Sequence, residues 1–300
     1  MGITNFPNGV SSWGIPQLGG SLPVKPGSPW WVDSATGSNS TGSELHPFAT
    51  IDQAVNAAAA GDLIIVKEGH SETISAATSL VLDVDGLTIV GLGSGSRRPR
   101  LDFSADVSRI PISADDVVIE NIVFMCSVAG IVSGVTVTGA DCQLRNCEWN
   151  LDATGLEFLQ MLDLDTADDV KVLGCRFIAE NIAGCNTAIR IDASPRVEIG
   201  YNVFQGDYTT CVIDGVTGTA AVSNDVNIHH NIIENKDSTA GACLDLGDAE
   251  TGIVSDNRCF TAFVTNLTGP WDPGNALCCE NFLVNDVDET GAKVPATASG

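Results

Sequence analysis

The sequence predicts an all-β fold: a parallel β-helix with three faces and about eight or more coils of roughly 27 residues each. The first observation is a recurring frame, apolar-x-apolar-x-x-(Asn, Cys or apolar)-x-large, whose apolar positions alternate as they do in strands. The sixth position of the frame falls at residues 92, 122, 147, 175, 202, 231, 257 and 281. The second observation is a further alternating segment between copies. The third is the dominance of Gly, Asn and β-branched residues without a helical period, which excludes helical repeats.

The alternating segments between the frames supply a second strand for each coil. They lie at residues 110–112, 135–137, 162–164, 189–191, 211–213 and 243–246. Successive frames are 24 to 30 residues apart, which is too long for a left-handed coil built from hexapeptides. At least two strands plus turns in each coil therefore favour the three-faced arrangement.

Residues 1–29 are predicted to form an extended N-terminal arm. Five prolines and several glycines interrupt any hydrophobic period. The arm nevertheless carries Phe6, Trp13, Ile15 and Leu18, which a solvated linker does not need. We expect these four residues to anchor the arm on another protein. The alternative is a strap that lies along its own domain.

Residues 30–285 are the predicted β-helix, and residues 286–300 form a polar C-terminal tail. A strand at 30–32 precedes a capping helix, in which Thr50 is the expected N-cap and Gln53 completes a capping box. The helix presents an apolar face at helical spacing and is expected to end at Gly61. Residues 63–66 are typical of a buried strand.

Four asparagines occupy the sixth position of the frame in the last copies: Asn202, Asn231, Asn257 and Asn281. Equivalent residues of neighbouring coils stack about 4.8 Å apart in a parallel solenoid. Each amide can then donate to one neighbour and accept from the other, so a buried polar column is tolerated. The sequence therefore predicts a structural asparagine ladder, which cysteines extend at residues 147 and 175.

Composition excludes several classes of function. The chain carries 14 Lys and Arg against 38 Asp and Glu, a formal net charge of −24, so no broad surface for nucleic acid is expected. No apolar run is long enough for a transmembrane helix, and no membrane partner is expected. The start of the chain lacks the pattern of a Sec signal peptide, which argues against a secreted bacterial surface protein. The ten cysteines form no CxxC pair and are interpreted mainly as reduced core residues, with Cys278 and Cys279 the least clear.

Two segments resemble known proteins. The segment HPFATIDQAVNAAAAGDLIIVKEGH resembles the N-terminal cap and first coil of the pectate-lyase-like right-handed parallel β-helix superfamily. The resemblance as a whole covers roughly residues 45–285. That resemblance implies a right-handed helix but no single function, because the fold hosts lyases, hydrolases, tailspikes and inert scaffolds. The opening ITNFPNGVSSWGIP is similar to the N-terminal arms of virion structural proteins of tailed phages. Together they imply a phage particle protein, such as a decoration (cement) protein of the head.

Acidic residues are the only candidates for chemistry. The densest cluster is Asp163, Asp165, Asp168 and Asp169, with Asp141, Asp192 and Asp214 expected on adjacent coils and Arg190 and Arg196 as possible bases. Oxygen ligands at this spacing suit Ca²⁺, but the favoured interpretation is a solvated acidic face of turn residues, and whether the cluster binds Ca²⁺ stays open. The Gly-His-Gly of polygalacturonase-like enzymes is absent, and exposed aromatic residues for a sugar groove are few.

Histidines add no catalytic or metal motif. His46, His70, His229 and His230 have no HExxH or CxxC partner, so zinc and other cofactors are not expected. No Ser-His-Asp or Cys-His arrangement stands out, and no catalytic residue is assigned.

The sequence therefore favours a non-enzymatic virion protein, made in the host cytoplasm and located on the capsid surface. We expect a homotrimer that binds the major capsid protein or another virion protein, because a trimer fits a local three-fold axis of a capsid. The alternative is a tailspike-like or fibre-like protein that binds or cleaves polysaccharide as a lyase or hydrolase.

Overall fold

The computed structural model describes most of the chain from residue 29 onward. The described residues are 11–12, 15–16, 29–38, 41–151, 153, 155–179, 185–216, 223–239, 241–247, 250–262, 271–285 and 292–293. Of the predicted anchor, Phe6, Trp13 and Leu18 lie outside the described residues, and Ile15 belongs to the short strand β2 (Ile15–Pro16), which pairs antiparallel with β1 (Ser11–Ser12). The predicted tail lies outside them as well, except for β29 (Ala292–Lys293).

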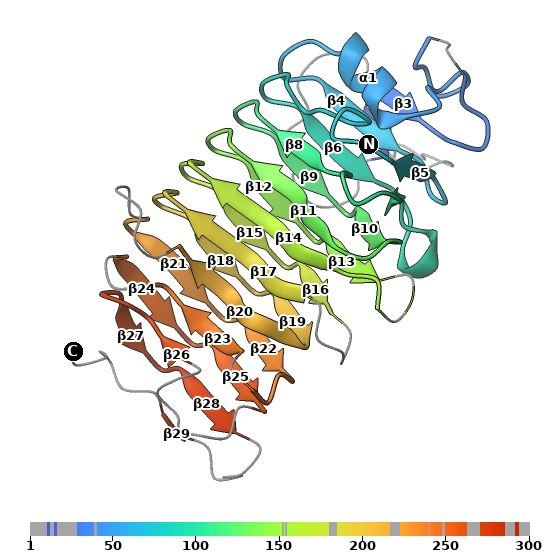
Figure 1. Ribbon diagram of the computed structural model, residues 1–300. Coiled ribbons are helices and arrows are strands. Elements are labelled where there is room, and N and C mark those ends of the chain that lie inside the picture. The colour runs from blue at the N-terminus through green and yellow to red at the C-terminus, as the bar shows by residue number, and fades with distance from the viewer. Residues whose placement is uncertain are drawn as a thin grey trace, which may run out of the picture.

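The body of the molecule is a parallel β-helix, as the repeat predicts (Figure 1). Three long sheets run along it, and each coil places its strands in the same order. The first sheet contains β3 (Trp30–Val32), β4 (Leu63–Val66), β6 (Thr88–Gly91), β9 (Val118–Glu120), β12 (Gln143–Arg145), β15 (Lys171–Leu173), β18 (Glu198–Gly200), β21 (Val226–His229), β24 (Gly252–Ser255) and β27 (Leu277–Cys279). All of its neighbouring strands pair parallel.

The second sheet follows the first around a tight corner. It contains β5 (Ser71–Ile74), β7 (Arg100–Phe103), β10 (Val123–Cys126), β13 (Glu148–Leu151), β16 (Arg176–Ile178), β19 (Val203–Gly206), β22 (Ile232–Asn235), β25 (Arg258–Thr261) and β28 (Phe282–Asn285). Strand β29 adds to its last edge in antiparallel orientation.

The third sheet has seven strands. They are β8 (Ile110–Ile112), β11 (Ile131–Val137), β14 (Phe158–Asp165), β17 (Cys185–Asp192), β20 (Tyr208–Gly215), β23 (Ala242–Asp245) and β26 (Trp271–Asp272). Among the described residues, about seven coils therefore contribute to all three sheets, and incomplete coils extend the first two sheets at both ends. The predicted fold class is confirmed.

The recurring frame spans a corner rather than one strand. In successive coils, the residue just before its sixth position has a left-handed backbone: Asn121, Asn146, Gly174, Tyr201, His230, Asp256 and Glu280, with φ between 52° and 66°. One such residue turns the chain sharply while the flanking residues stay extended. The frame therefore supplies the end of one strand and the start of the next. The alternation of apolar residues in the sequence did not show that the frame contains parts of two strands.

The interior is filled by aligned apolar columns. The rings of Phe124, Trp149, Phe177 and Phe204 follow one another in neighbouring coils, with centroids 4.7, 4.5 and 4.9 Å apart. This stack explains the large residue at the end of the frame, and burying such rings contributes strongly to stability. All ten cysteines are free, and all except Cys279 are buried. Burial raises the pKa of a thiol in this core, to about 12 at Cys126, which makes it unreactive.

Helix α1 (Ile51–Ala57) lies at the N-terminal end of the β-helix (Figure 1). Its capping box forms as predicted, because the Thr50 hydroxyl accepts from the backbone N–H of Gln53 and the Gln53 amide oxygen accepts from that of Thr50. The prediction that it ends at Gly61 is wrong. Ala58 is already extended, and Gly61 instead makes a left-handed turn before β4. Among the described residues, no helix has the length and apolar character required to cross a membrane.

Candidate functional site

The four asparagines of the predicted ladder form one buried column at the corner between the first and second sheets. Each of their side chains has no exposed surface. The Oδ1 atom of Asn231 accepts from the backbone N–H of Asn202 at 3.0 Å and from its Nδ2 at 3.1 Å. Asn257 and Asn281 repeat this pattern one and two coils further on. The column satisfies amide groups that would otherwise be buried without partners.

The second hydrogen of each amide ties the ladder to the first sheet. The Nδ2 groups donate to backbone carbonyls one coil earlier, for example from Asn231 to Ile199 at 2.9 Å. At the N-terminal end of the ladder, the backbone N–H of Cys175 donates to Asn202 Oδ1 at 2.8 Å. The cysteine therefore continues the column without a side-chain amide. These contacts leave the asparagines no exposed polar atom for a ligand, and their role is structural.

A row of charged residues runs along the outward face of the third sheet. Strand pairing places Asp163 of β14 beside Arg190 of β17, Arg190 beside Asp214 of β20, and Asp214 beside Asp245 of β23. Asp272 of β26 continues the row beside Asp245. We call these five residues the acidic row. They point outward because the alternate residues of each strand, such as Leu162 and Leu164 in β14, are buried.

Arg190 is the centre of the acidic row. Its Nη1 donates to Asp163 Oδ1 at 2.9 Å, and its Nη2 donates to Asp192 Oδ2 at 2.8 Å. The three side chains are largely buried, so solvent screens these ion pairs only in part. One guanidinium thus holds carboxylates of two adjacent coils in fixed positions.

Asp214 differs from the other carboxylates of the acidic row. Burial raises its pKa to about 6, the negative charge of Asp245 adds to the rise, and the positive charge of Arg190 opposes it. A carboxyl group with a pKa near 6, beside ionised carboxylates, has the protonation behaviour of a general acid. Burial also raises the pKa of Asp163, against the hydrogen bond from Arg190.

The predicted acidic cluster separates into two groups. Asp163, Asp165, Arg190, Asp192 and Asp214 lie on the third sheet, whereas Asp141, Asp168, Asp169 and Arg196 lie at the corner that leads into the first sheet. At that corner, the guanidinium of Arg196 donates to Asp169 at 2.8 Å and to Asp168 at 3.0 Å. It lowers the pKa of Asp169. Both groups therefore pair charges between neighbouring coils.

Sequence reasoning missed Asp245 and Asp272 as members of the acidic row. Asp245 lies in the segment at 243–246, whose distance from the segment at 211–213 differs from the earlier intervals, and Asp272 lies in none of the alternating segments, so the register with Asp214 was not evident. Aligning the second alternating segments of successive coils residue by residue is the signal that finds them. Within the described residues, no group of three or more His, Cys, Asp or Glu side chains is placed to hold a metal ion.

The histidines occupy separate places. His70 is buried, and its Nδ1 accepts from the backbone N–H of Ser34 at 3.0 Å, so its Nε2 donates to Glu72 at 3.2 Å. His229 ends β21 and contacts Glu198 at 3.2 Å. His230 lies exposed at the left-handed corner rather than on a strand, and His46 lies in an isolated bridge with Ser43. The described structure brings none of these residues into the acidic row.

Comparisons with known proteins identify the fold. No protein-family model matches the chain, and no curated protein is similar to it in sequence. Among solved structures, the pectate lyase Pel9A shares 13% identity at a TM-score of 0.55, over 86% of this chain and 77% of its own. A rhamnogalacturonan lyase shares 11% identity at a TM-score of 0.47, over 78% and 69%. ORF18 of Geobacillus virus E2 shares 12% identity at a TM-score of 0.36, over 79% and 57%. The fold of this chain is therefore the right-handed parallel β-helix found in pectate lyase.

Proposed function

We propose that the chain is a non-enzymatic structural protein of a phage virion, a homotrimer that decorates the surface of the head. The observation that carries the proposal is the pairing of charged side chains between coils. Arg190 joins Asp163 of the acidic row to Asp192, and Arg196 joins two more carboxylates at the adjacent corner. Such pairs stabilise and order a scaffold, whereas a catalytic groove needs charged groups that are open to a substrate.

The location on a particle rests on the N-terminal arm. The segment ITNFPNGVSSWGIP is similar to the arms of virion proteins, and its apolar residues suit anchoring on the major capsid protein or another virion protein. The buried free thiols agree with folding in the reducing cytoplasm of a host.

The homotrimer is supported by an apolar patch on the last four coils. Of nine exposed large apolar side chains among the described residues, six lie there: Tyr201, Ile232, Ile253, Phe260, Leu277 and Phe282. We call these six residues the C-terminal apolar patch. A cavity of about 470 Å³ is lined by three of them, Tyr201, Ile232 and Phe282, together with Asp256 and Arg258, whereas Ile253 and Leu277 lie on the first sheet. A second copy of the chain fits this surface, because each copy offers apolar groups and charges of both signs.

Particle binding is the test of the proposed function. Antibodies against the chain should label the heads of intact particles, and a chain lacking residues 1–29 should keep the circular dichroism of the β-helix but no longer bind capsids. The full-length chain is the control in the same sedimentation assay. Truncated protein that still decorates capsids would contradict the anchor, and unlabelled particles would contradict the virion role.

Asp214 favours a second candidate function, cleavage of a polysaccharide. Its raised pKa suits a general acid in the acidic row, beside Arg190 and ionised carboxylates. The test is release of reducing ends or unsaturated products from polygalacturonate and host capsular polysaccharide. Turnover that falls at least about 100-fold in Asp214→Asn, Asp163→Ala or Asp165→Ala would replace the structural proposal with this one. No turnover by the full-length chain would remove it.

A further inference from the structure

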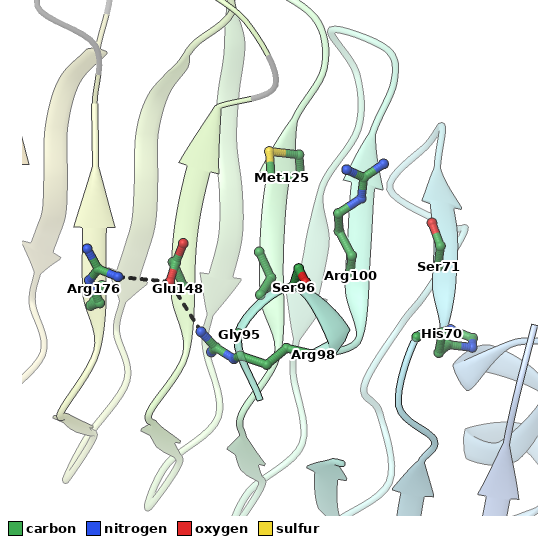
Figure 2. A pocket seen from close by; sticks show the side chains of 11 residues that line it. His70, Ser71, Gly95, Ser96, Arg98, Arg100, Met125, Glu148 and Arg176 are labelled. Carbon is green, nitrogen blue, oxygen red and sulfur yellow. Dashed lines mark hydrogen bonds and ion pairs between the residues drawn. The ribbon is translucent and has the colours of Figure 1, made fainter. Parts of the chain in front are cut away.

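A cavity of about 700 Å³ lies on the outward face of the second sheet, toward the N-terminal end of the β-helix (Figure 2). Its last strand, β16, is one coil before Tyr201 of the C-terminal apolar patch, and the two cavities share no lining residue. Its floor is formed by β7, β10, β13 and β16. One side is the turn of 3₁₀ helix Gly95–Arg97, in the segment that joins β6 to β7. Neither the acidic row nor the asparagine ladder contributes to it. Its volume is that of a site for a small organic molecule.

Three arginines line this cavity: Arg98, Arg100 and Arg176. The chain has only 14 Lys and Arg in 300 residues and a net charge of −24, so three guanidinium groups in one cavity stand out from the rest of the surface. The lining also contains one carboxylate, Glu148, and Arg100 contacts Asp102 at 2.8 Å. The local balance is positive by one charge, in a molecule that is strongly negative elsewhere.

Glu148 orients two of the three arginines. Its Oε2 lies 3.2 Å from Nη1 of Arg98 and 3.5 Å from Nη1 of Arg176, so the two guanidinium groups approach it from opposite sides (Figure 2). Arg98 is fixed further, because its Nη2 donates to the backbone carbonyls of Ile122 at 3.2 Å and Asn146 at 2.6 Å. These contacts hold the guanidinium groups in place before any ligand arrives, which lowers the entropy cost of binding.

One buried N–H group beside the cavity has no partner in the described structure. The Nε of Arg98 is buried and has no hydrogen-bond acceptor. Arg100 uses its Nε to contact Asp102, and the only ion pair of Arg176 is with Glu148. A buried unpaired donor costs about 1–3 kcal/mol, which an anionic ligand would recover. Guanidinium N–H pairs match the geometry of carboxylate and phosphate oxygens.

The floor between the arginines is apolar. Val123 and Met125 of β10 lie between Arg100 on β7 and Glu148 on β13. Arg100 and Arg176 stand three strands apart in the same column, about 14 Å between their backbones. A ligand with an organic body would therefore cover the apolar floor while its charged end meets an arginine.

We propose that this cavity binds a small organic molecule through an oxyanion, either a carboxylate or a phosphate group. The site is independent of the proposed virion role and of the acidic row. The oxyanion contacts Arg100 or Arg176, which stand at opposite ends of the apolar floor, whereas Glu148 is a positioning residue. The negative charge of the rest of the molecule disfavours anion binding elsewhere on the surface.

Titration calorimetry of the full-length chain tests the site, with inorganic phosphate and citrate as separate probes at about 0.05 M NaCl. Binding of at least one probe is expected, and its Kd should rise about tenfold or more in Arg100→Gln or in Arg176→Gln, whichever removes the charge-assisted hydrogen bond to the oxyanion. An unchanged Kd in both variants would contradict the assignment. The matched control is Arg109→Gln, an exposed arginine outside the cavity, whose Kd should stay within about twofold. Which probe binds identifies the oxyanion.

Two outcomes would overturn the site. One is the absence of binding by both probes, and the other is an equal loss of affinity in Arg109→Gln, which would show attraction by general charge alone. Melting curves of each variant verify that the β-helix is intact. Arg98 is not substituted, because it also donates hydrogen bonds to the backbone carbonyls of Ile122 and Asn146, and its loss could disturb the fold.

Discussion

Single residues in this protein act through the partners that the coil repeat places beside them. Asn231 shows this most clearly, because its amide makes four hydrogen bonds to residues of the coils before and after it. The sequence predicted this column, since a recurring residue at a constant position of a solenoid must stack on its own equivalents.

Asn231→Ala should lower the free energy of unfolding by about 3 kcal/mol, because it removes the acceptor of the Asn202 backbone N–H and one donor each from the Ile199 carbonyl and Asn257 Oδ1. Urea denaturation monitored by circular dichroism measures the change. The control is Asn227→Ala, an exposed asparagine on β21, with an expected change within about 0.5 kcal/mol. Equal changes in the two variants would contradict a ladder that contributes to stability.

Asp214 makes stability depend on pH. Its pKa is 3.8 in the unfolded chain and about 6 in the folded protein, so the folded state holds a proton that the unfolded state releases. The resulting stabilisation is full below about pH 4 and is lost as pH rises through 6. Asp214→Asn should therefore gain about 1 kcal/mol at about pH 7, a modest value because the side chain keeps partial contact with water.

Melting temperatures of Asp214→Asn and the unchanged chain between about pH 4 and pH 7 test this difference. The gain should shrink toward the acidic end of the range. A gain that is the same at every pH would show that Asp214 does not titrate there. Asp169→Asn is the contrast, because Arg196 lowers the pKa of Asp169, so this change should slightly destabilise the protein near neutral pH.

At the scale of elements, the corner between the first and second sheets determines both the turn of the backbone and part of the exposed surface. In earlier coils its left-handed residue is Asn121, Asn146 or Gly174, which accept this conformation readily. Tyr201 and Glu280 adopt it less readily, because positive φ strains the backbone of a bulky residue. The strain falls within the C-terminal apolar patch, where the exposed ring of Tyr201 stacks on His230 at 4.9 Å.

Tyr201→Asn should therefore raise the free energy of unfolding by about 0.5–1 kcal/mol, because asparagine suits the left-handed corner. The same change should weaken self-association, because it removes a large exposed ring from the patch. Thermal denaturation and sedimentation velocity of one preparation measure both effects. A loss of stability would contradict the assignment of strain to this corner.

The elements differ in how far they could be predicted. The helix cap at Thr50 and Gln53 follows from local hydrogen bonding, so the sequence located it correctly. The end of the same helix was misplaced, because Ala58 leaves the helical conformation before any glycine is reached. The corner inside the frame was missed for a related reason: one left-handed residue does not disturb the alternation of apolar side chains on either side of it.

At the scale of the whole molecule, a net charge of −24 opposes association between copies. If the C-terminal apolar patch joins three copies, raising NaCl from about 0.05 M to 0.5 M should strengthen the trimer by screening this repulsion. Phe282→Ser should weaken it at both salt concentrations, whereas Leu45→Ser, an exposed leucine near the N-terminal end, should not. Sedimentation equilibrium gives the dissociation constants. A monomer under all conditions would rule out the homotrimer.

The sequence by itself determined the period, the strand character of the repeats, the capping helix, the asparagine column and the acidic character of the surface. Each of these follows from local preference or from repetition, because every coil meets the same neighbours. Only the tertiary structure decided which charged residues meet. Asp163 and Asp169 are close in sequence but lie on a sheet and at a corner, while Asp214 and Asp245 are distant in sequence and pair side by side. The convergence of Arg98, Arg100 and Arg176 likewise depends on coil register and on the segment between β6 and β7. Variable coil lengths shift that register by several residues, so charge partners across coils are set by how the coils stack rather than by their order along the chain.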